Sequence, residues 1–477
     1  MGRAQVRFLR VAVIAVVVVF GLDVNSYADD EQPPAAAPTY TRDVAPIVFD
    51  KCAHCHRAGE VAPMSLLTYE ETRPWARAIK KKVVDREMPP WHADPQYGKF
   101  KDDRSLSDRE IDIIVKWADA GAPKGDPAHM PPAPTFVSGW QGGQPDVIFE
   151  MPDYPVAAEG ELPNEYIWVP NPHKEDLLVS QLELRPGNAS VVHHIRVDAV
   201  ALPEGCAVIN SKLAAIDGKP CKEPGGANDV LNDRGDRYYL VAYVPGRTLE
   251  RHAPGTAKRI TGGHWIRFNV HYQPSGVETT DRSKLGVWLS KVPVTHEVFT
   301  RTTGQALPTD TDVTRLIAEG KEVVRDATIG RGGNNGSGRL PNIPPFAENW
   351  ELIGITPVTE PITIYALSPH MHLRGKDLKW IVTWPDGREE VILNVPKYDF
   401  NWQLQYKLMT PLKLPAGSRV TAIAHFDNSA KNKYNPSPEK EVFWAEQSWD
   451  EMFSPFMEYT VDSQNVAAEP SKRTQKR

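Results

Sequence analysis

Residues 52–56 read Cys52-Ala53-His54-Cys55-His56, a C-x-x-C-H pentapeptide. Two thiols three positions apart can each form a thioether to a vinyl group of haem, and the histidine that follows can bind the iron from one face. A chance C-x-x-C, half of a zinc site and a redox dithiol are the alternatives. However, a zinc site needs a second ligand pair, no further cysteine occurs before Cys206, and a thioredoxin-like dithiol does not require His56. The pentapeptide therefore predicts covalently bound haem c.

Amphipathic segments on both sides of the pentapeptide predict a small helical unit over residues 39–124. Apolar residues recur at helical spacing in residues 40–51, and a second helix is expected over residues 75–84. Ser107 and Glu110 form a capping box before a third apolar stripe. The order helix, C-x-x-C-H, loop, methionine, helix resembles class I cytochrome c, and this resemblance implies a small all-α cytochrome c domain.

The iron needs a second axial ligand, and Met88 is the predicted one. Met88 lies in a proline-rich loop after the second expected helix, which would hold its thioether rigidly. Met64 and His92 are the alternatives. A thioether ligand favours ferrous haem and raises its potential. With His56 and Met88 on opposite faces, the haem would carry single electrons and would not bind oxygen.

Length and composition describe an ordinary globular protein. The chain has 477 residues, 41% of them apolar and 24% charged, and this length suggests about three domains. The formal net charge of −6 gives no reason to expect nucleic acid or an anionic membrane as a partner. The 43 prolines favour loops and β-structure over long helices.

The N-terminus has the pattern of a signal peptide. Arg3, Arg7 and Arg10 precede the apolar run 11–22, which is too short to span a bilayer. Ser26 and Ala28 are small residues at the two positions that a signal peptidase reads, which predicts cleavage after Ala28 and removal of residues 1–28. We expect an exported protein, periplasmic or secreted in a bacterium, with no membrane span in its mature form.

Cys206 and Cys221 are the remaining cysteines. In an oxidising compartment we expect them to form a disulfide, although two free thiols are the alternative. Since all four cysteines are then used, none is left as a thiolate ligand for blue copper.

Beyond a proline-rich linker at residues 125–144, short β-type runs separated by turn residues predict two all-β antiparallel sandwiches of the jelly-roll kind. We divide them into residues 145–294 and 295–462, followed by a polar tail at 463–477. The glycine-rich stretch 330–338 is expected to be a surface loop. The expected strands are residues 177–184, 191–201, 238–244, 265–272, 285–289, 362–367, 378–383, 390–395, 403–408 and 419–425.

Several histidines in strand-like contexts suggest metal ligands. His370 and His372 flank Met371, and on a strand the period of two would place both imidazoles on one face. His193 and His194 are adjacent, so a regular strand would point them to opposite faces. Binding one ion together would need a bulge, a twist or different ring nitrogens.

The residues alone leave the remaining candidates open. His271 is isolated on its expected strand, and Met452 far downstream offers a thioether, but both types are common as packing residues. The pattern therefore indicates a metal site at His370 and His372, zinc included, and an unassigned histidine pair.

Four motifs nevertheless occur in one order over residues 145–462, and this order resembles the type II copper, ascorbate-dependent monooxygenases, the family of the peptidylglycine α-hydroxylating and dopamine β-monooxygenases. The stretch 425–444 is also similar to bacterial relatives, some of which carry a cytochrome c domain in front. The motifs are Val191-Val192-His193-His194, Val270-His271-Tyr272, Ser368-Pro369-His370-Met371-His372-Leu373-Arg374-Gly375-Lys376 and Asp450-Glu451-Met452.

The resemblance implies two coppers per chain. One would store an electron, and the other would be the catalytic copper that meets O₂ and substrate. It implies hydroxylation of a C–H bond of a small substrate, with electrons from the haem, from ascorbate, or from both, and with a periplasmic electron donor as a partner. The alternatives are a non-catalytic haem–copper electron-transfer or copper-binding protein and, less in keeping with a thioether ligand, a zinc hydrolase. The implied ligands are His193, His194 and His271 for the first copper, and His370, His372 and Met452 for the second.

The sequence also departs from that family. Where the peptide-amidating enzymes hold the substrate carboxylate with Arg, Asn and Tyr, this chain has Ser368, Ser454 and Phe456. A peptide C-terminus is therefore not the expected substrate. Phe456, Phe453 and Trp449 form either an apolar pocket wall or ordinary core.

Overall fold

Short helices and many strands make up the computed structural model. It describes residues 37–467 except 217, 219–220, 222–236, 247–248, 304–322, 325–341 and 446, and only the backbone of 237–238 and 323–324. Residues 38–477 cluster as one structural unit. The predicted signal peptide and the glycine-rich stretch 330–338 lie outside the described residues.

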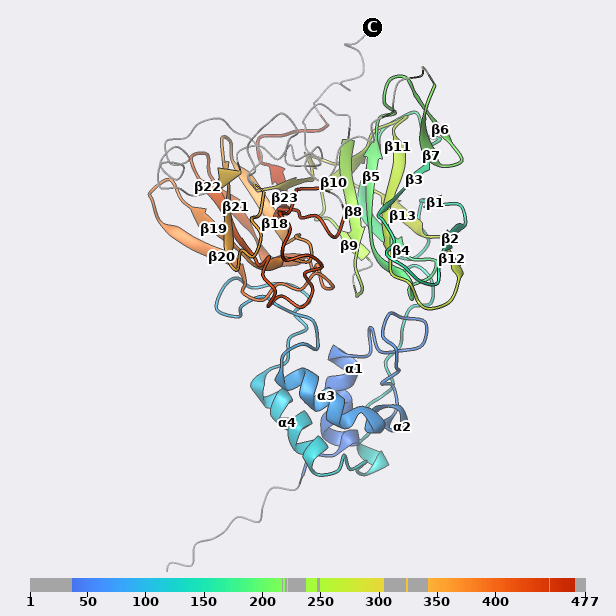
Figure 1. Cartoon of the computed structure of the whole chain (residues 1–477), viewed down its shortest axis with the longest axis vertical. Helices are drawn as coiled ribbons and strands as arrows, with labels where there is room; N and C mark the ends of the chain where they lie inside the picture. Colours follow the sequence, from blue (N-terminus) through green and yellow to red (C-terminus); the bar gives the residue numbers. More distant parts are fainter. Residues whose placement is uncertain are drawn as a thin grey trace, which may run out of the picture. The chain divides into compact units, whose positions relative to one another are not determined.

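The helices lie between Tyr40 and His129 and are grouped together in Figure 1. Ser107 caps the longest, because its hydroxyl accepts the Glu110 N–H at 3.3 Å and the Glu110 carboxylate accepts the Ser107 N–H at 2.7 Å. Tyr40 and Trp117 are fully buried in the apolar core of this region. The elements are η1 (Tyr40–Val44, a π-helix), α1 (Ala45–Lys51), α2 (Tyr69–Thr72), η2 (Arg73–Trp75), α3 (Ala76–Val84), α4 (Asp108–Asp119) and η3 (Pro127–His129).

Between α3 and α4, residues 91–101 leave the helices and pack against C-terminal strands. We call them the 91–101 segment. The Lys101 N–H donates to the Lys407 carbonyl at 2.8 Å. The Phe100 ring lies 5.4 Å from the Tyr406 ring, and both side chains belong to the apolar core of the C-terminal strands. Backbone hydrogen bonds and aromatic packing together fix the segment there.

Most of the strands β1 to β14 form two larger sheets around one apolar core, whereas β2 pairs with β12 and β6 pairs with β7 in two-stranded sheets. Their orders are β1-β13-β4-β10-β14, with β9 paired to β4, and β3-β11-β5-β8. β14 pairs with β10 in parallel. The strands are β1 (Val147–Glu150), β2 (Tyr154–Val156), β3 (Glu165–Val169), β4 (Leu177–Arg185), β5 (Val192–Val200), β6 (Cys206–Ile209), β7 (Lys212–Ala215), β8 (Arg237–Tyr243), β9 (Leu249–Arg251), β10 (Thr256–Ile260), β11 (Trp265–Tyr272), β12 (Thr279–Asp281), β13 (Lys284–Leu289) and β14 (His296–Glu297).

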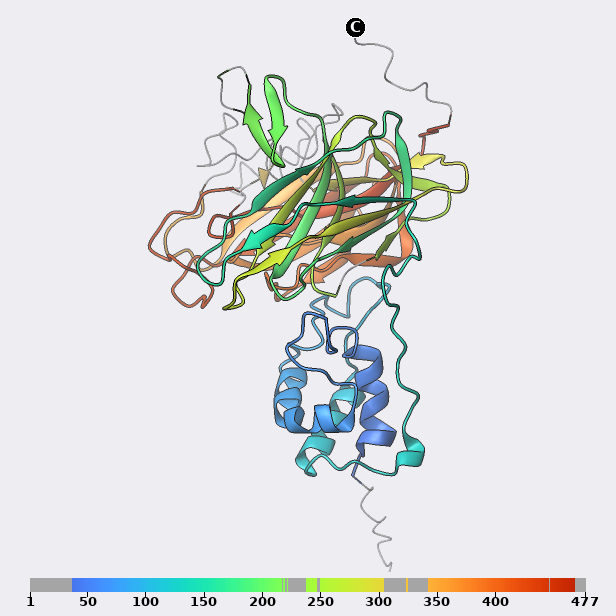
Figure 2. The ribbon, with the colours of Figure 1, turned by 90° about the vertical axis from the view of Figure 1, so that its right-hand side faces the viewer.

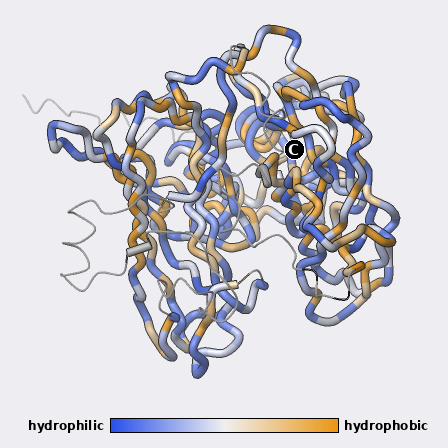
Figure 3. Tube along the Cα trace, turned by 90° about the horizontal axis from the view of Figure 1, so that it is seen from above, coloured by the Kyte–Doolittle hydropathy of each residue, from blue (hydrophilic) through white to orange (hydrophobic). Residues whose placement is uncertain are grey.

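The strands β15 to β23 form two further sheets, ordered β15-β23-β18-β21 and β16-β17-β22-β19-β20. In β22 every second residue from Val420 to Phe426 is buried, which is the pattern of a strand with one face on the apolar core. Figure 3 colours the whole chain by the hydropathy of its residues. The strands are β15 (Phe299–Thr302), β16 (Val323–Val324), β17 (Trp350–Pro357), β18 (Ile362–Ser368), β19 (Gly375–Thr383), β20 (Glu389–Val395), β21 (Tyr406–Leu414), β22 (Arg419–Phe426) and β23 (Phe456–Val461).

The fold class predicted from the sequence is wrong. The described chain is mostly β, its α-helices are only 4 to 12 residues long, and no sizeable all-α cytochrome c domain is seen in it. One physical reason is that the 91–101 segment, which lies inside the predicted domain, packs against β-strands through the buried residues Ala93 and Phe100. The β-region is also not two purely antiparallel sandwiches, because two of its four larger sheets contain a parallel pair.

Cys206 and Cys221 form the predicted disulfide, whereas Cys52 and Cys55 are free thiols. Cys206 begins β6, and the β6–β7 hairpin extends away from the larger sheets in Figure 2. Among the described residues, no helix has the length and apolar character that crossing a bilayer requires.

Candidate metal centre

His193, His194 and His271 come together from two neighbouring strands, β5 and β11. His271 lies opposite His194, but the next residue, Tyr272, lies opposite Val192, so His193 is an extra residue in the ladder. This irregularity is a β-bulge, which re-aims a side chain that would otherwise face the other way. The bulge that two adjacent histidines would need on one ion is therefore present.

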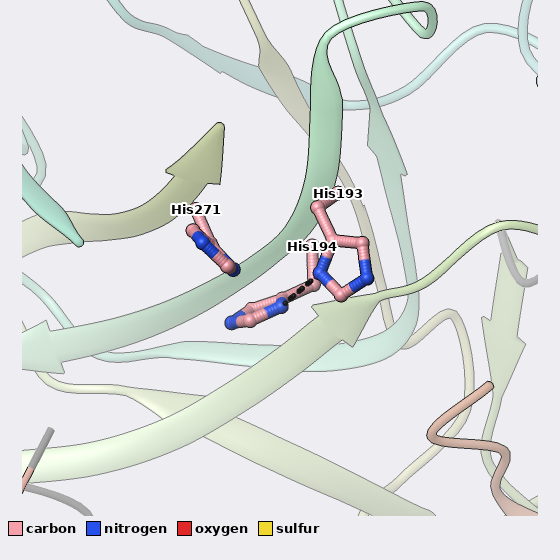
Figure 4. Close-up of side chains that lie close together, drawn as sticks. All are labelled: His193, His194 and His271. Carbon is pink, nitrogen blue, oxygen red and sulfur yellow. Dashed lines mark hydrogen bonds between the residues drawn. The ribbon is translucent and has the colours of Figure 1, made fainter. Parts of the chain in front are cut away.

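The three imidazoles surround one small space (Figure 4). One nitrogen from each ring lies within 4.8 Å of the others, and the Nδ1 atoms of His193 and His194 are 3.0 Å apart. Burial lowers the pKa of His271 to about 3, and burial together with the neighbouring imidazoles holds the pKa of His194 well below its ordinary value. These shifts favour the neutral form of His194 and His271, which is the form that binds metal.

His370, His372 and Met452 form a second set. His370 Nε2 lies 3.3 Å from Met452 Sδ, and the two imidazole centroids are 5.3 Å apart. The sequence-based interpretation placed both histidines on a strand, but they lie in the connection between β18 and β19. The alternation still holds there, because Met371 between them is fully buried in the apolar core.

Hydrogen bonds fix the orientation of both rings in this second set. Gln403 Oε1 accepts a hydrogen bond from His370 Nδ1, and the Asp450 carbonyl accepts one from His372 Nδ1 at 3.3 Å. His372 thereby keeps Nε2 for another partner, whereas His370 Nε2 faces Met452 Sδ. Metal-bound histidines usually carry such a hydrogen bond on the second nitrogen.

Glu451 ties the two chain segments of the second set together. Its buried carboxylate accepts the backbone N–H groups of His372 at 2.8 Å, Arg374 at 2.6 Å and Met452 at 3.0 Å. Burial raises the pKa of Glu451 to about 7 although these three bonds lower it. The Glu451 side chain thus links the loop of His370 and His372 to the loop of Met452 through three hydrogen bonds.

The two sets lie close to each other. The Phe400 ring centroid is 5.1 Å from the His193 ring and 5.9 Å from the His372 ring, so it contacts both sets. One pocket with about 610 Å³ of empty space, part of it open to solvent, is lined by His194 from the first set and by the whole second set. The second set and His194 of the first set therefore border one pocket.

The remaining predicted pocket residues divide into wall and core. Ser368 and Phe456 line the pocket, and Phe456 packs against Met452. Phe453 belongs to the C-terminal apolar core instead. Ser454 is fully buried, and its N–H donates to the His370 carbonyl at 3.0 Å. Trp449 contributes its carbonyl, which accepts from Arg374 Nη1 at 2.9 Å.

The C-x-x-C-H residues are compatible with a covalent haem. Cys52 and Cys55 form no disulfide, and His56 Nδ1 lies 3.3 Å from the Met64 carbonyl, which leaves Nε2 available for iron. Met88 is half-buried just after α3, and its role as sixth ligand stays a prediction. Of the rivals, Met64 packs on the helical core, and His92 lies in the 91–101 segment.

The donor types fit copper. Imidazole binds both Cu(II) and Cu(I), and a thioether favours Cu(I), so three imidazoles and an imidazole pair with a thioether suit two redox-active coppers. His271 Nδ1 is buried and makes no hydrogen bond, as expected for an atom that a metal would occupy.

A further group of possible ligands is better explained as an ion-pair network. Glu250, His252 and Glu458 lie close together and are buried, but the buried Lys258 ammonium is 2.7 Å from Glu250 and 3.3 Å from Glu458. The lysine already supplies the positive charge that two buried carboxylates require.

Sequence patterns did not single out Glu451, Gln403 or Phe400 as site residues. Glu451 lies directly before Met452, so that position was the only available signal. Gln403 and Phe400 precede β21 and reach the site only through the packing of distant segments.

The comparisons with known proteins add no identification. No family model and no curated protein matches the chain. A structure described as a candidate α-L-fucosidase from Bacteroides ovatus is 7% identical, with 69% of this chain and 41% of that chain aligned at a TM-score of 0.17. An infectious bursal disease virus structure (Gx strain) is 9% identical, with 68% of this chain and 73% of that chain aligned at a TM-score of 0.17. An allantoicase structure is 7% identical, with 58% of this chain and 79% of that chain aligned at a TM-score of 0.15. Similarity this low supports no inference about fold or function.

Proposed function

We propose that this protein is a copper-dependent monooxygenase that hydroxylates a C–H bond of a small substrate with O₂. Its electrons would come through a covalently bound haem c, from ascorbate, or from both. The observation that carries the proposal is the pocket lined by His194 together with His370, His372 and Met452. The ordered motifs that resemble the type II copper monooxygenases support the same function.

Copper held by the two sets would supply one-electron redox chemistry and O₂ activation. The chain itself orients the donors: Gln403 and the Asp450 carbonyl hold the rings of His370 and His372, and Glu451 fixes their loop. Such supporting hydrogen bonds typically matter nearly as much as the ligands.

The pocket walls suit a partly apolar substrate. Phe456 and Tyr239 pack around Met452 on one side, while the amide side chains of Asn164 and Gln403 lie in the pocket wall. Ser368 lines the pocket where the peptide-amidating enzymes have an arginine, so the proposal does not extend to peptide C-termini.

The predicted signal peptide supports export, and the Cys206–Cys221 disulfide is compatible with an oxidising compartment. We therefore propose that the protein works in the periplasm or outside the cell, where a one-electron donor would reduce it.

The test is incorporation of ¹⁸O from ¹⁸O₂ during a substrate screen with copper-loaded protein and ascorbate. We expect labelled product from the wild type and from His129→Ala, an exposed control on η3, but none from His370→Ala. Copper uptake without labelled product from any substrate would favour the non-catalytic electron carrier. Zinc in place of copper would contradict both readings.

A further inference from the structure

We propose that the haem passes its electrons to the three-histidine copper of the same chain through a junction formed by Cys55, Arg104 and Gly246. This inference rests on the proposed function, because it presumes haem at the C-x-x-C-H motif and copper at His193, His194 and His271. It specifies what the sequence left open, namely whether the haem serves its own chain or another molecule.

Direct contact at Gly246 carries the inference. Arg104 Nη2 donates to the Gly246 carbonyl at 3.3 Å, which joins the haem-binding region to the turn after β8. A Cβ added at Gly246 would lie 2.7 Å from Arg104 Nη1 and 3.3 Å from Cys55 Sγ. Glycine also adopts the required φ of +83° without strain. The β8 turn therefore lies against the sulfur atom that would carry a haem thioether.

The same strand leads from this junction into the metal pocket. β8 ends at Tyr243, and Tyr243 and Val244 both line the pocket that His194 lines. Tyr243 lies opposite Ile195, the residue that follows His194 on β5. Tyr243 is also buried, and this burial is the main cause that raises its pKa. The path from Cys55 to His194 thus follows one strand end and one cross-strand pair.

The 91–101 segment makes the junction a fixed arrangement. It ends three residues before Arg104, and it is bonded to the C-terminal strands, for example from the Asp94 N–H to the Asn394 carbonyl at 2.8 Å. Met409 N–H donates to the Lys99 carbonyl, also at 2.8 Å. The haem-binding region is thereby held by a second attachment in addition to the proline-rich linker, so reduction within the chain does not depend on a chance encounter.

Each transfer moves one electron and no proton. Haem held at the C-x-x-C-H motif would go from ferrous to ferric, and copper held by His193, His194 and His271 would go from Cu(II) to Cu(I). A one-electron donor from outside the chain, such as ascorbate or a small redox protein, then reduces the haem again. One hydroxylation needs two such transfers.

The test is anaerobic flash reduction of oxidised, copper-loaded full-length protein, with haem absorbance followed as the electron moves on. We expect a first-order decay whose rate does not change with protein concentration, because donor and acceptor share one chain. Arg104→Leu should slow this decay about three- to tenfold, since a partly exposed, charge-assisted hydrogen bond is lost. The decay rate of Arg104→Lys should lie between those of the wild type and Arg104→Leu. Arg77→Leu, an exposed arginine on α3, is the matched control and should match the wild type.

A decay rate that rises with protein concentration, or an Arg104→Leu rate equal to that of the wild type, would overturn the inference. The ascorbate-driven ¹⁸O assay separates this failure from failure of the proposed function. Labelled product from Arg104→Leu with ascorbate, together with slow haem oxidation, supports the junction. Labelled product together with an unchanged haem rate refutes the junction and leaves the monooxygenase proposal standing.

Discussion

Glu451→Ala should destabilise the protein and loosen its second donor set. The Glu451 side chain is fully buried and accepts three backbone N–H groups, those of His372, Arg374 and Met452. Alanine would leave three buried donors without an acceptor, at a cost of about 1 kcal/mol or more each, or roughly 3 kcal/mol in total. For a cooperative unit of 150–250 residues, this corresponds to a fall in Tm of roughly 6–12 °C.

The assay is thermal unfolding by circular dichroism together with a copper titration. Copper affinity should fall about 10- to 100-fold, because the loops of His372 and Met452 lose their common support. Glu451→Gln keeps one acceptor oxygen, which can still serve the N–H groups of His372 and Met452, so its losses should be smaller. Glu348→Ala is the surface control, since Glu348 forms only an exposed pair with Lys431 and should change stability little. An unchanged Tm and copper affinity in Glu451→Ala would refute the reasoning.

Two further predictions concern stability. The hydrogen bond with Asp377, 2.7 Å away, raises the pKa of His425, so its contribution to stability is complete below the ordinary histidine pKa and is lost as pH rises through the raised value. The stability difference between wild type and His425→Gln should therefore be largest at mildly acid pH and shrink at alkaline pH in urea titrations; a difference that grows with pH would contradict this. Cys221→Ser should lower stability by about 3 kcal/mol, because a 15-residue loop is no longer closed. Addition of dithiothreitol to the wild type should reproduce the loss, and equal stability of the oxidised and reduced proteins would argue against it.

Local patterns predicted many elements well. The Ser107–Glu110 capping box marks the start of α4, and the alternation in residues 419–425 matches β22. Both signals act within a few residues of chain, which is why a sequence reveals them. The two adjacent histidines likewise required an irregular strand, and the register shift at His193 supplies one.

Long-range packing was not predictable from the sequence. Phe100 looks like an ordinary apolar residue of the helical region, yet it packs on Tyr406, about 300 positions away along the chain. No periodicity indicates such a partner, so the all-α domain was expected and is not found. The pairing across the predicted domain boundary at residue 295 was also not visible in the sequence, because β14 lies just beyond this boundary and pairs with β10 before it.

Within the candidate site, the sequence indicated the donors but not their support. Histidine and methionine are recognisable as ligands by residue type. Glu451, by contrast, supports the second set by accepting three backbone N–H groups. The Phe400 ring contacts one imidazole of each set. Their contributions depend on backbone positions that only the folded chain defines.

The central claim is that two separate donor sets each hold one copper beside one covalent haem. The most direct test is metal analysis of purified protein after copper loading and dialysis, with haem counted by absorbance. We predict two coppers and one haem per chain in the wild type, and one copper per chain in His271→Ala and in His372→Ala. Zinc in the protein, a wild type with fewer than two coppers, or two coppers retained in either variant would contradict the claim.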